Sequence, residues 1–296
     1  MAETSDAGGI TDLTVLAQTP SLPQEFARAV LTGRGRSGAA GTVPGTALQV
    51  STAVDREHLL AYQRLCGFKV NDVLPHTYPH VLGFPLQAAL MADPDFPLPM
   101  VGLVHIANAT TVHRTLTADD ELTLTVSAEG LFAHAKGVLV DLKLAVSAAG
   151  ELVWESTSTY LRRGPSGGTP TLITEQPEVP AGSADAIWRL GADLGRRYAG
   201  VAGDINPIHL HPWTAKAMGF PRAIAHGMWT YARTLAALGD RVNGPCRSEV
   251  WFRKPVLLPS KVALRTNNDL TVAALTSTKD SDRTHLLLQL DPLTAT

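Results

Sequence analysis

Cysteine is scarce in this chain of 296 residues, which has only Cys66 and Cys246, far apart and outside any CxxC pair. This scarcity excludes a disulfide-rich secreted scaffold and a cysteine-based zinc framework, and it fits a reducing compartment. Long apolar runs are also missing, since no uninterrupted run approaches the roughly 20 residues that span a bilayer. The segment from Met1 to Pro20 lacks the basic and apolar regions of a signal peptide. We therefore expect a soluble, cytoplasmic protein.

The chain also has nearly equal numbers of acidic and basic residues. The formal net charge is −2, and charged residues make up 18% of the chain. A protein without a general basic field is a poor candidate for a nucleic-acid partner. Hydrophobic residues make up 45% of the sequence, and this length is enough to bury a sizeable core in about two domains.

Two glycine-rich segments match motifs whose structural context is absent. The run Gly33-Arg34-Gly35-Arg36-Ser37-Gly38 fits GxGxxG, but no strand is expected before it, and the glycines and proline that come after it oppose a helix. The run Gly164-Pro165-Ser166-Gly167-Gly168 fits GxSxG, but its surroundings read as a linker. We therefore expect neither a dinucleotide site nor a nucleophilic serine.

The most informative segment confines one carboxylate and one imidazole to a short bend, Tyr198-Ala199-Gly200-Val201-Ala202-Gly203-Asp204-Ile205-Asn206-Pro207-Ile208-His209. On a regular helix, side chains five residues apart diverge by roughly 140°. Asp204 and His209 therefore converge only if the backbone bends between them. Asn206 and Pro207 supply the bend, and Gly203 permits a backbone conformation that a Cβ would forbid. The segment predicts an acid/base pair with Gly203, Asn206 and Pro207 as loop support.

A second block, Ala225-His226-Gly227-Met228, begins a predicted helix from Gly227 to Leu238 that Gly239 ends. The amino terminus of a helix carries unpaired N–H groups and the positive end of a dipole. Acid/base catalysis on a carbonyl compound also needs donors for the negative charge that collects on the carbonyl oxygen. The backbone N–H of Gly227 is our candidate for that oxyanion donor.

Other interpretations of these residues are open. Asp-x-Asn-Pro is also ordinary turn chemistry, Asn206 fits a residue that fixes the loop, and His226 fits a packing or capping residue as well as a substrate-binding one. Asp204, His209 and His211 could in principle ligate a metal, but no second cluster accompanies them. We expect no metal and no cofactor.

On the two blocks 203–209 and 225–228, the chain resembles the MaoC-like, or (R)-specific enoyl-CoA hydratase (hydratase 2), family. The resemblance covers roughly residues 196 to 230. It implies a hot-dog fold, in which an antiparallel sheet wraps around a central helix. It also implies that Asp204 and His209 hold a water that adds to, or leaves from, the α,β double bond of an acyl thioester.

The order of predicted elements indicates a duplication. Residues 1–45 read as a partly flexible leader with one helix near Pro23 to Leu31, residues 46–163 as a first unit, 164–184 as a linker, and 185–296 as a second unit. Tyr62 and Gly67 lie 136 positions before Tyr198 and Gly203. At that offset Phe68 and Val73 stand where the second unit has its acid and base. With the resemblance, this predicts an α+β double hot-dog whose N-terminal unit is non-catalytic.

The expected substrate is an acyl thioester carried by coenzyme A or acyl carrier protein. His226, Met228, Arg222, Arg253 and Lys254 are candidate substrate-binding residues, and the basic ones fit phosphate groups or a scattered solvated surface equally. Phe68, Phe84, Leu86 and Leu90 could house an acyl tail or simply pack a core. The predicted activity is (R)-specific hydration or dehydration in fatty acid metabolism by a monomeric pseudo-dimer or a homodimer. A hot-dog thioesterase and a catalytically silent acyl-binding subunit are the alternatives.

Overall fold

The structure is a computed structural model that describes residues 10–33, 36, 42–165 and 175–293. Most of the GxGxxG and GxSxG segments, and part of the predicted linker, lie outside the described residues. Among the described residues, no helix combines the length and apolar character needed to cross a bilayer.

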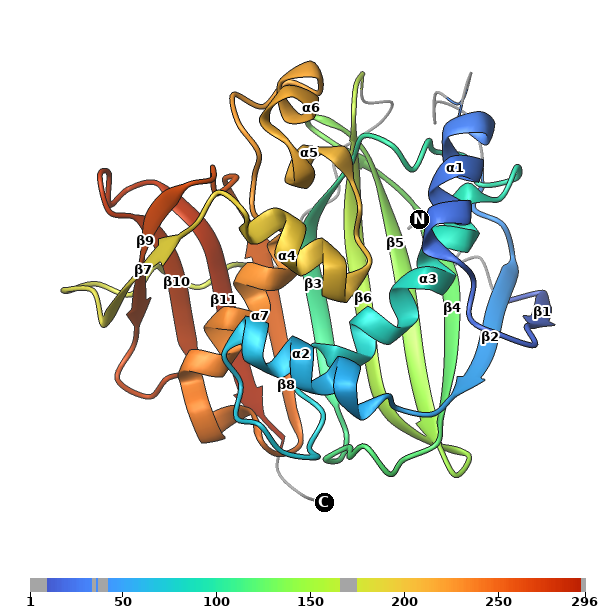
Figure 1. The fold of residues 1–296 in the computed structure, drawn as a ribbon, viewed down its shortest axis with the longest axis horizontal. Coiled ribbons are helices and arrows are strands. Elements are labelled where there is room, and N and C mark those ends of the chain that lie inside the picture. The colour runs from blue at the N-terminus through green and yellow to red at the C-terminus, as the bar shows by residue number, and fades with distance from the viewer. Residues whose placement is uncertain (1–9, 34–35, 37–41, 166–174, 294–296) are drawn as a thin grey trace, which may run out of the picture.

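One mixed sheet of eleven strands runs through the described part of the chain, in the order β1-β2-β4-β5-β6-β3-β8-β11-β10-β9-β7 (Figure 1). Neighbouring strands are antiparallel except for β1 and β2, which are parallel. The strands are β1 (Asp12–Val15), β2 (Thr46–Thr52), β3 (Leu103–Val112), β4 (Leu122–His134), β5 (Gly137–Ala148), β6 (Glu151–Arg163), β7 (Ala186–Leu190), β8 (Cys246–Phe252), β9 (Ser260–Thr266), β10 (Val272–Ser277) and β11 (Thr284–Pro292).

The sheet consists of two halves with the same strand order. Counted inward from its outer strand, one half reads β2-β4-β5-β6-β3 and the other reads β7-β9-β10-β11-β8. They meet at a seam, the antiparallel pairing of β3 with β8, where Ala107 lies opposite Trp251. We refer to residues 46–163 as the N-terminal unit and to residues 185–293 as the C-terminal unit. This repeated architecture confirms the predicted double hot-dog fold.

Helices cover one face of the sheet (Figure 1). They are α1 (Leu22–Thr32), α2 (Arg56–Cys66), α3 (Tyr78–Ala92), α4 (Leu194–Ala202), α5 (Pro207–Leu210), α6 (Pro212–Ala217) and α7 (Gly227–Leu238), followed by a 3-10 helix (Gly239–Val242). Every residue of α3 except Leu82 is buried, so this helix has no polar face and occupies the centre of the N-terminal unit. In the C-terminal unit α7 has the same position, with Tyr231, Ala232 and Leu235 fully buried.

The helices α2 and α4 are equivalent and end in the same way. Gly67 and Gly203 come directly after their last residues with φ of +80° and +72°, in the left-handed region that favours glycine. Tyr62 and Tyr198 also approach each other, with ring centroids 6.4 Å apart. The residue offset predicted from the sequence therefore matches equivalent positions in the fold.

The two units differ in the segment that connects this glycine to the central helix. In the C-terminal unit α5 and α6 lie between α4 and the central helix, whereas in the N-terminal unit no helix lies between α2 and α3. The leader also contributes to the packed fold: α1 packs against α3, and β1 pairs with β2 at one edge of the sheet. The sequence predicts α1 but not β1.

Candidate active site

The loop between α4 and α5 reverses because of three residues. Gly203 ends α4 in the left-handed conformation, and a Cβ there would collide with Leu22 of α1. Asn206 caps α5, since its side-chain oxygen accepts a hydrogen bond from the N–H of Ile208 at 3.4 Å. Pro207 is the first residue of α5, where its missing N–H costs nothing. This reversal turns the start of α5 back toward the end of α4.

The carboxylate of Asp204 is fixed at one oxygen and open at the other. Its Oδ1 accepts a hydrogen bond from the N–H of Asn206 at 3.1 Å. Its Oδ2 lies 3.7 Å from Nε2 of His226, and 28% of the side chain is exposed. Asp204 also lines a cavity. The carboxylate can therefore accept a further hydrogen bond from a molecule in that cavity.

His209 is buried beside Asp204, and its ring orientation is set by the main chain. Its Nδ1 lies 2.8 Å from the carbonyl oxygen of Ile224. Because a carbonyl oxygen only accepts, Nδ1 carries the proton and Nε2 presents a lone pair. Burial lowers the pKa of His209 below its usual value, and the charge of Asp204 partly opposes that change. The imidazole is therefore a neutral base at neutral pH.

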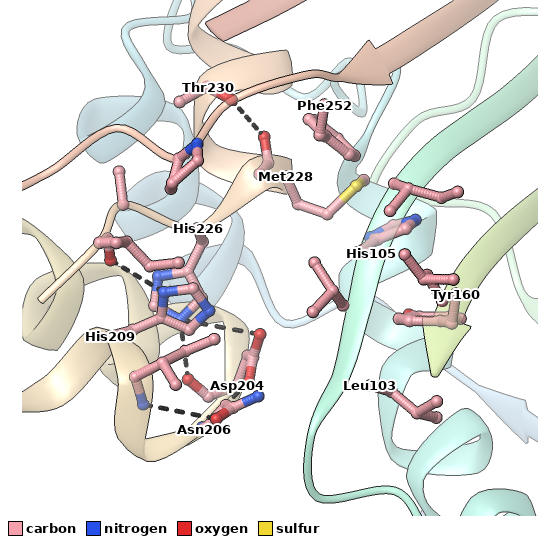
Figure 2. A pocket seen from close by; sticks show the side chains of 18 of the residues that line it. Leu103, His105, Tyr160, Asp204, Asn206, His209, His226, Met228, Thr230 and Phe252 are labelled. Carbon is pink, nitrogen blue, oxygen red and sulfur yellow. Dashed lines mark hydrogen bonds and ion pairs between the residues drawn. The ribbon is translucent and has the colours of Figure 1, made fainter. Parts of the chain in front are cut away.

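His226 connects the loop to the start of α7. Its Nε2 donates a hydrogen bond to the main-chain carbonyl oxygen of Asp204 at 2.9 Å. Its ring stacks on that of His209, with centroids 3.7 Å apart (Figure 2). Burial, together with the neighbouring His209, lowers the pKa of His226 well below its usual range. Neutral His226 therefore acts as a rigid support for both members of the predicted acid/base pair.

Asp204, His209 and His226 offer ligand atoms that all lie within 4.8 Å of one another, a spacing compatible with a metal ion. However, Nδ1 of His209 and Nε2 of His226 are engaged with carbonyl oxygens, and the rings stack rather than converge on a point. The trio with His211 does not form. Nδ1 of His211 instead accepts from the N–H of Trp213 and caps α6.

The helix α7 begins at the wall of the same cavity. Gly227 is its first residue and lines the cavity, and the first N–H groups of a helix have no partner within it. A Cβ at Gly227 would lie 3.1 Å from the ring of Phe252. The absence of a side chain therefore leaves the backbone at this point accessible to a ligand.

The cavity has a volume of about 460 Å³ and is lined by both units. Asp204, His209 and His226 lie on one side, and Leu103, His105 and Tyr160 face them from β3 and β6 (Figure 2). A volume of this size is typical of small-molecule sites. The N-terminal unit therefore supplies the wall opposite the predicted acid/base pair.

The other predicted site residues divide between the cavity and the surface. Met228, Arg253 and Lys254 line the cavity, and the two basic side chains are exposed. Arg222 is exposed but is not among the cavity-lining residues.

The four apolar residues of the N-terminal unit also divide. Phe84 lines the cavity, whereas Leu86 and Leu90 belong to the core and Phe68 lines a separate, smaller cavity.

Three polar residues of the cavity wall escape prediction from the sequence. His80, His105 and Tyr160 stand on α3, β3 and β6, separated by many residues and outside any motif. No polar/apolar alternation marks Tyr160 in the sequence, because the five residues before it in β6 are all polar, although alternate side chains of that strand are buried in the fold.

Comparison with known proteins identifies relatives of this chain. The family model of the MaoC-like domain matches residues 186–281. The chain is 37% identical to 3-hydroxyacyl-thioester dehydratase X of Mycobacterium tuberculosis over 214 residues, which cover 71% of this chain and 76% of that protein.

Solved structures match over most of the chain. The crystal structure of HtdX of M. tuberculosis matches with a TM-score of 0.72 and 33% identity, over 83% of this chain and 100% of the other. A conserved hypothetical protein of M. tuberculosis described as a double hot-dog matches in fold alone, with a TM-score of 0.53 and 12% identity, over 88% and 99% of the two chains. The extent of the match to the M. tuberculosis dehydratase, together with the family model, shows that this chain belongs to the MaoC-like dehydratase family.

Proposed function

We propose that the protein hydrates 2-enoyl thioesters and dehydrates (3R)-3-hydroxyacyl thioesters in fatty acid metabolism, with Asp204 and His209 as its acid/base pair. The observation that carries the proposal is the convergence of the Asp204 carboxylate and the His209 imidazole on one cavity wall beside the start of α7. The name of the 37% identical relative, a 3-hydroxyacyl-thioester dehydratase, supports the same reaction.

The protonation states favour a shared water. The Asp204 carboxylate and Nε2 of neutral His209 are both hydrogen-bond acceptors, and one water has two protons to give them. A water held in this way directs an oxygen lone pair at the β-carbon of an enoyl thioester. As the water oxygen bonds to the β-carbon, one of the two groups takes a proton from the water and the electrons of the double bond move toward the thioester. That group then gives the proton to the α-carbon, and the reverse sequence expels water from a 3-hydroxyacyl thioester.

Negative charge collects on the thioester oxygen as water adds, and it needs a donor. The N–H of Gly227 at the start of α7 is our candidate, assisted by the positive end of the helix dipole. Met228, the next residue, lines the cavity and would contact the substrate. Donors of this kind contribute on the order of 10²- to 10³-fold to kcat in enzymes where they have been removed.

We propose that catalysis belongs to the C-terminal unit and that residues 46–163 form a non-catalytic partner. At the offset of 136, the N-terminal unit has Phe68 and Val73 in place of Asp204 and His209. Neither side chain can transfer a proton. One chain supplies both walls of the cavity, so a monomer or a homodimer can be active.

The carrier and the compartment are part of the same proposal. Arg253 and Lys254 are exposed at the cavity, where they would meet the phosphates of coenzyme A or an acidic carrier protein. Both cysteines are free and buried, which suits the reducing cytoplasm.

The test is a spectrophotometric assay that follows the enoyl-thioester absorbance with crotonyl-CoA and longer enoyl-CoA substrates, with chiral analysis of the product. Loss of absorbance with formation of the (3R)-hydroxyacyl thioester is the expected result. Release of free thiol without a hydroxyacyl product would instead identify a thioesterase, and binding without turnover would identify a silent acyl-binding protein.

A further inference from the structure

The cavity wall opposite Asp204 contains stacked polar rings beside the aliphatic side chain of Leu103. His105 stacks on Tyr160 with centroids 4.5 Å apart and an interplanar angle of 22°. His80 in turn stacks on His105, with centroids 6.0 Å apart and an interplanar angle of 19°. We refer to His80, His105 and Tyr160 as the polar wall. All three line the cavity, and His105 and Tyr160 face the catalytic loop (Figure 2).

The polar wall has hydrogen-bonding capacity that the described part of the chain does not use. Nδ1 of His80 and Nε2 of His105 are buried without a partner in that part. The Tyr160 hydroxyl donates to Oε1 of Gln87 at 3.2 Å, which leaves its own oxygen able to accept. Gln87 is fully buried but does not line the cavity, so only His80, His105 and Tyr160 of this cluster can offer polar atoms to a ligand there. Buried polar groups are normally paired, so this cluster indicates a ligand with matching polar atoms.

The polar wall is electrically neutral. Burial lowers the pKa of His80 to about 4 and the pKa of His105 to about 3. The pKa of the Tyr160 hydroxyl is raised, first by burial and then by the charge of Asp204. Neutral imidazoles and a phenol match hydroxyl or oxo groups, whereas a carboxylate would find no cation there.

The polar wall lies close to Asp204, where the α- and β-carbons of a substrate would react. The charge of Asp204 acts on both His80 and Tyr160, so these rings lie within electrostatic reach of the catalytic carboxylate. Beyond His80 the contacts become apolar, since Phe84 lies 6.4 Å from His80 and Phe26 lies 6.5 Å from Phe84. A substrate chain would therefore pass a polar zone first and an apolar zone second.

We propose that the preferred acyl group carries a neutral oxygen substituent, hydroxyl or oxo, a short distance beyond its β-carbon, and that the polar wall recognises it. This inference rests on the proposed hydratase function and names the substrate class for it. A plain alkyl chain would leave the polar wall unpaired, so it should be the poorer substrate.

The experiment compares enoyl-CoA substrates of equal length, one plain and the others with a hydroxyl or oxo group at successive carbons beyond the β-carbon. For the wild type we expect kcat/KM with the best oxygenated substrate to exceed that of the plain one by about 10-fold. His80→Leu and His105→Leu should each lower this ratio several-fold and raise kcat/KM for the plain chain. Met91→Leu, at an apolar cavity position, is the matched control and should leave the ratio unchanged.

His105→Phe keeps a flat ring in the stack and serves as a second variant if His105→Leu does not fold. Equal or better turnover of the plain chain by the wild type, or a ratio that the histidine variants do not change, would overturn the inference while leaving the hydratase function intact. Absence of turnover with every substrate would reject the hydratase function and this inference together.

Discussion

Gly67 and Gly203 end equivalent helices in the same left-handed conformation, with φ of +80° and +72°, but only Gly203 leads into the loop that carries Asp204, a member of the proposed acid/base pair. Comparing the two glycines distinguishes the conformational requirement of the backbone from the requirement for a correctly placed Asp204. The two glycines share one conformational reason to be glycine, although a Cβ would meet Leu22 at position 203 and Arg233 at position 67.

Gly203→Ala and Gly67→Ala should each reduce the free energy of unfolding by about 1–2 kcal/mol, because a Cβ disfavours the left-handed conformation. We expect only Gly203→Ala to lower kcat as well, by shifting Asp204. Urea denaturation and enoyl-CoA kinetics on the two variants check this. Equal losses of activity in both variants would show that the loss does not come from a shift of Asp204.

Asp204→Asn and His209→Gln should each reduce kcat by about 10²- to 10⁴-fold, since each removes one proton-transfer group. KM should change little, because the acyl chain and carrier contacts lie elsewhere in the cavity. Thermal unfolding of both variants provides the control for folding. A rate close to wild type in either variant would reject the proposed pair.

Gly227→Ala should lower kcat/KM by at least about 10-fold, because the added methyl group would crowd both Phe252 and the thioester oxygen near the candidate oxyanion donor. The matched control is Gly200→Ala on the exposed surface of α4, where a Cβ meets nothing within 4 Å. That control should stabilise the protein by up to about 1 kcal/mol with normal turnover. Turnover equal to that of the wild type in Gly227→Ala would show that the substrate does not approach the backbone of Gly227 closely.

Arg253→Ala and Lys254→Ala should each raise KM for coenzyme A substrates several-fold, with less effect at high salt, where charge interactions are screened. Arg222→Ala is the control, because that side chain is exposed and does not line the cavity. Steady-state kinetics at two ionic strengths measure the effect. If all three variants have the KM of the wild type, coenzyme A does not bind at Arg253 and Lys254.

Stability should fall as the pH falls below about 6.5, because buried neutral histidines must be protonated in the unfolded chain. Burial lowers the pKa of six histidines in the fold, namely His76 and His105 to about 3, His80 to about 4, and His209, His226 and His285 below the usual value. The unfolded state then binds more protons than the folded state, and each histidine contributes about 1 kcal/mol per pH unit. Above about pH 7 these groups contribute no pH dependence.

Urea midpoints measured from about pH 7.5 down to about pH 5 test this expectation. His76→Gln should show a shallower decline than the wild type, because one buried imidazole is gone; His76 lies outside the main cavity and contacts Ser248 and Cys246. A stability that does not change over this range would contradict neutral burial of these rings.

The sequence predicts the fold well wherever local chemistry determines it. Asp55 caps α2 through the N–H groups of Glu57 and His58, and Gly67 ends that helix, as a capping residue and a terminal glycine indicate. The apolar pattern likewise predicts the strands of both units. By contrast β1, four exposed residues in parallel contact with β2, has no burial pattern to reveal it.

The candidate site is predictable only in part, because local sequence patterns do not specify contacts between distant segments. Asp204, His209 and Gly227 belong to compact motifs in which spacing carries the information. The hydrogen bond from His226 to the carbonyl oxygen of Asp204 and the wall of His80, His105 and Tyr160 depend on tertiary packing between distant segments. No local pattern specifies them.

The seam between β3 and β8 joins a half that would perform the chemistry to a half that faces it across the cavity. In a symmetric homodimer every substitution occurs in both subunits. A substitution that adapts the cavity wall to a new substrate therefore also changes the subunit that performs the reaction. A fused chain escapes this coupling. Substitutions in the N-terminal unit can change the substrate preference while the C-terminal unit keeps the residues of the reaction. One gene can therefore evolve new substrate ranges without altering its proposed catalytic residues.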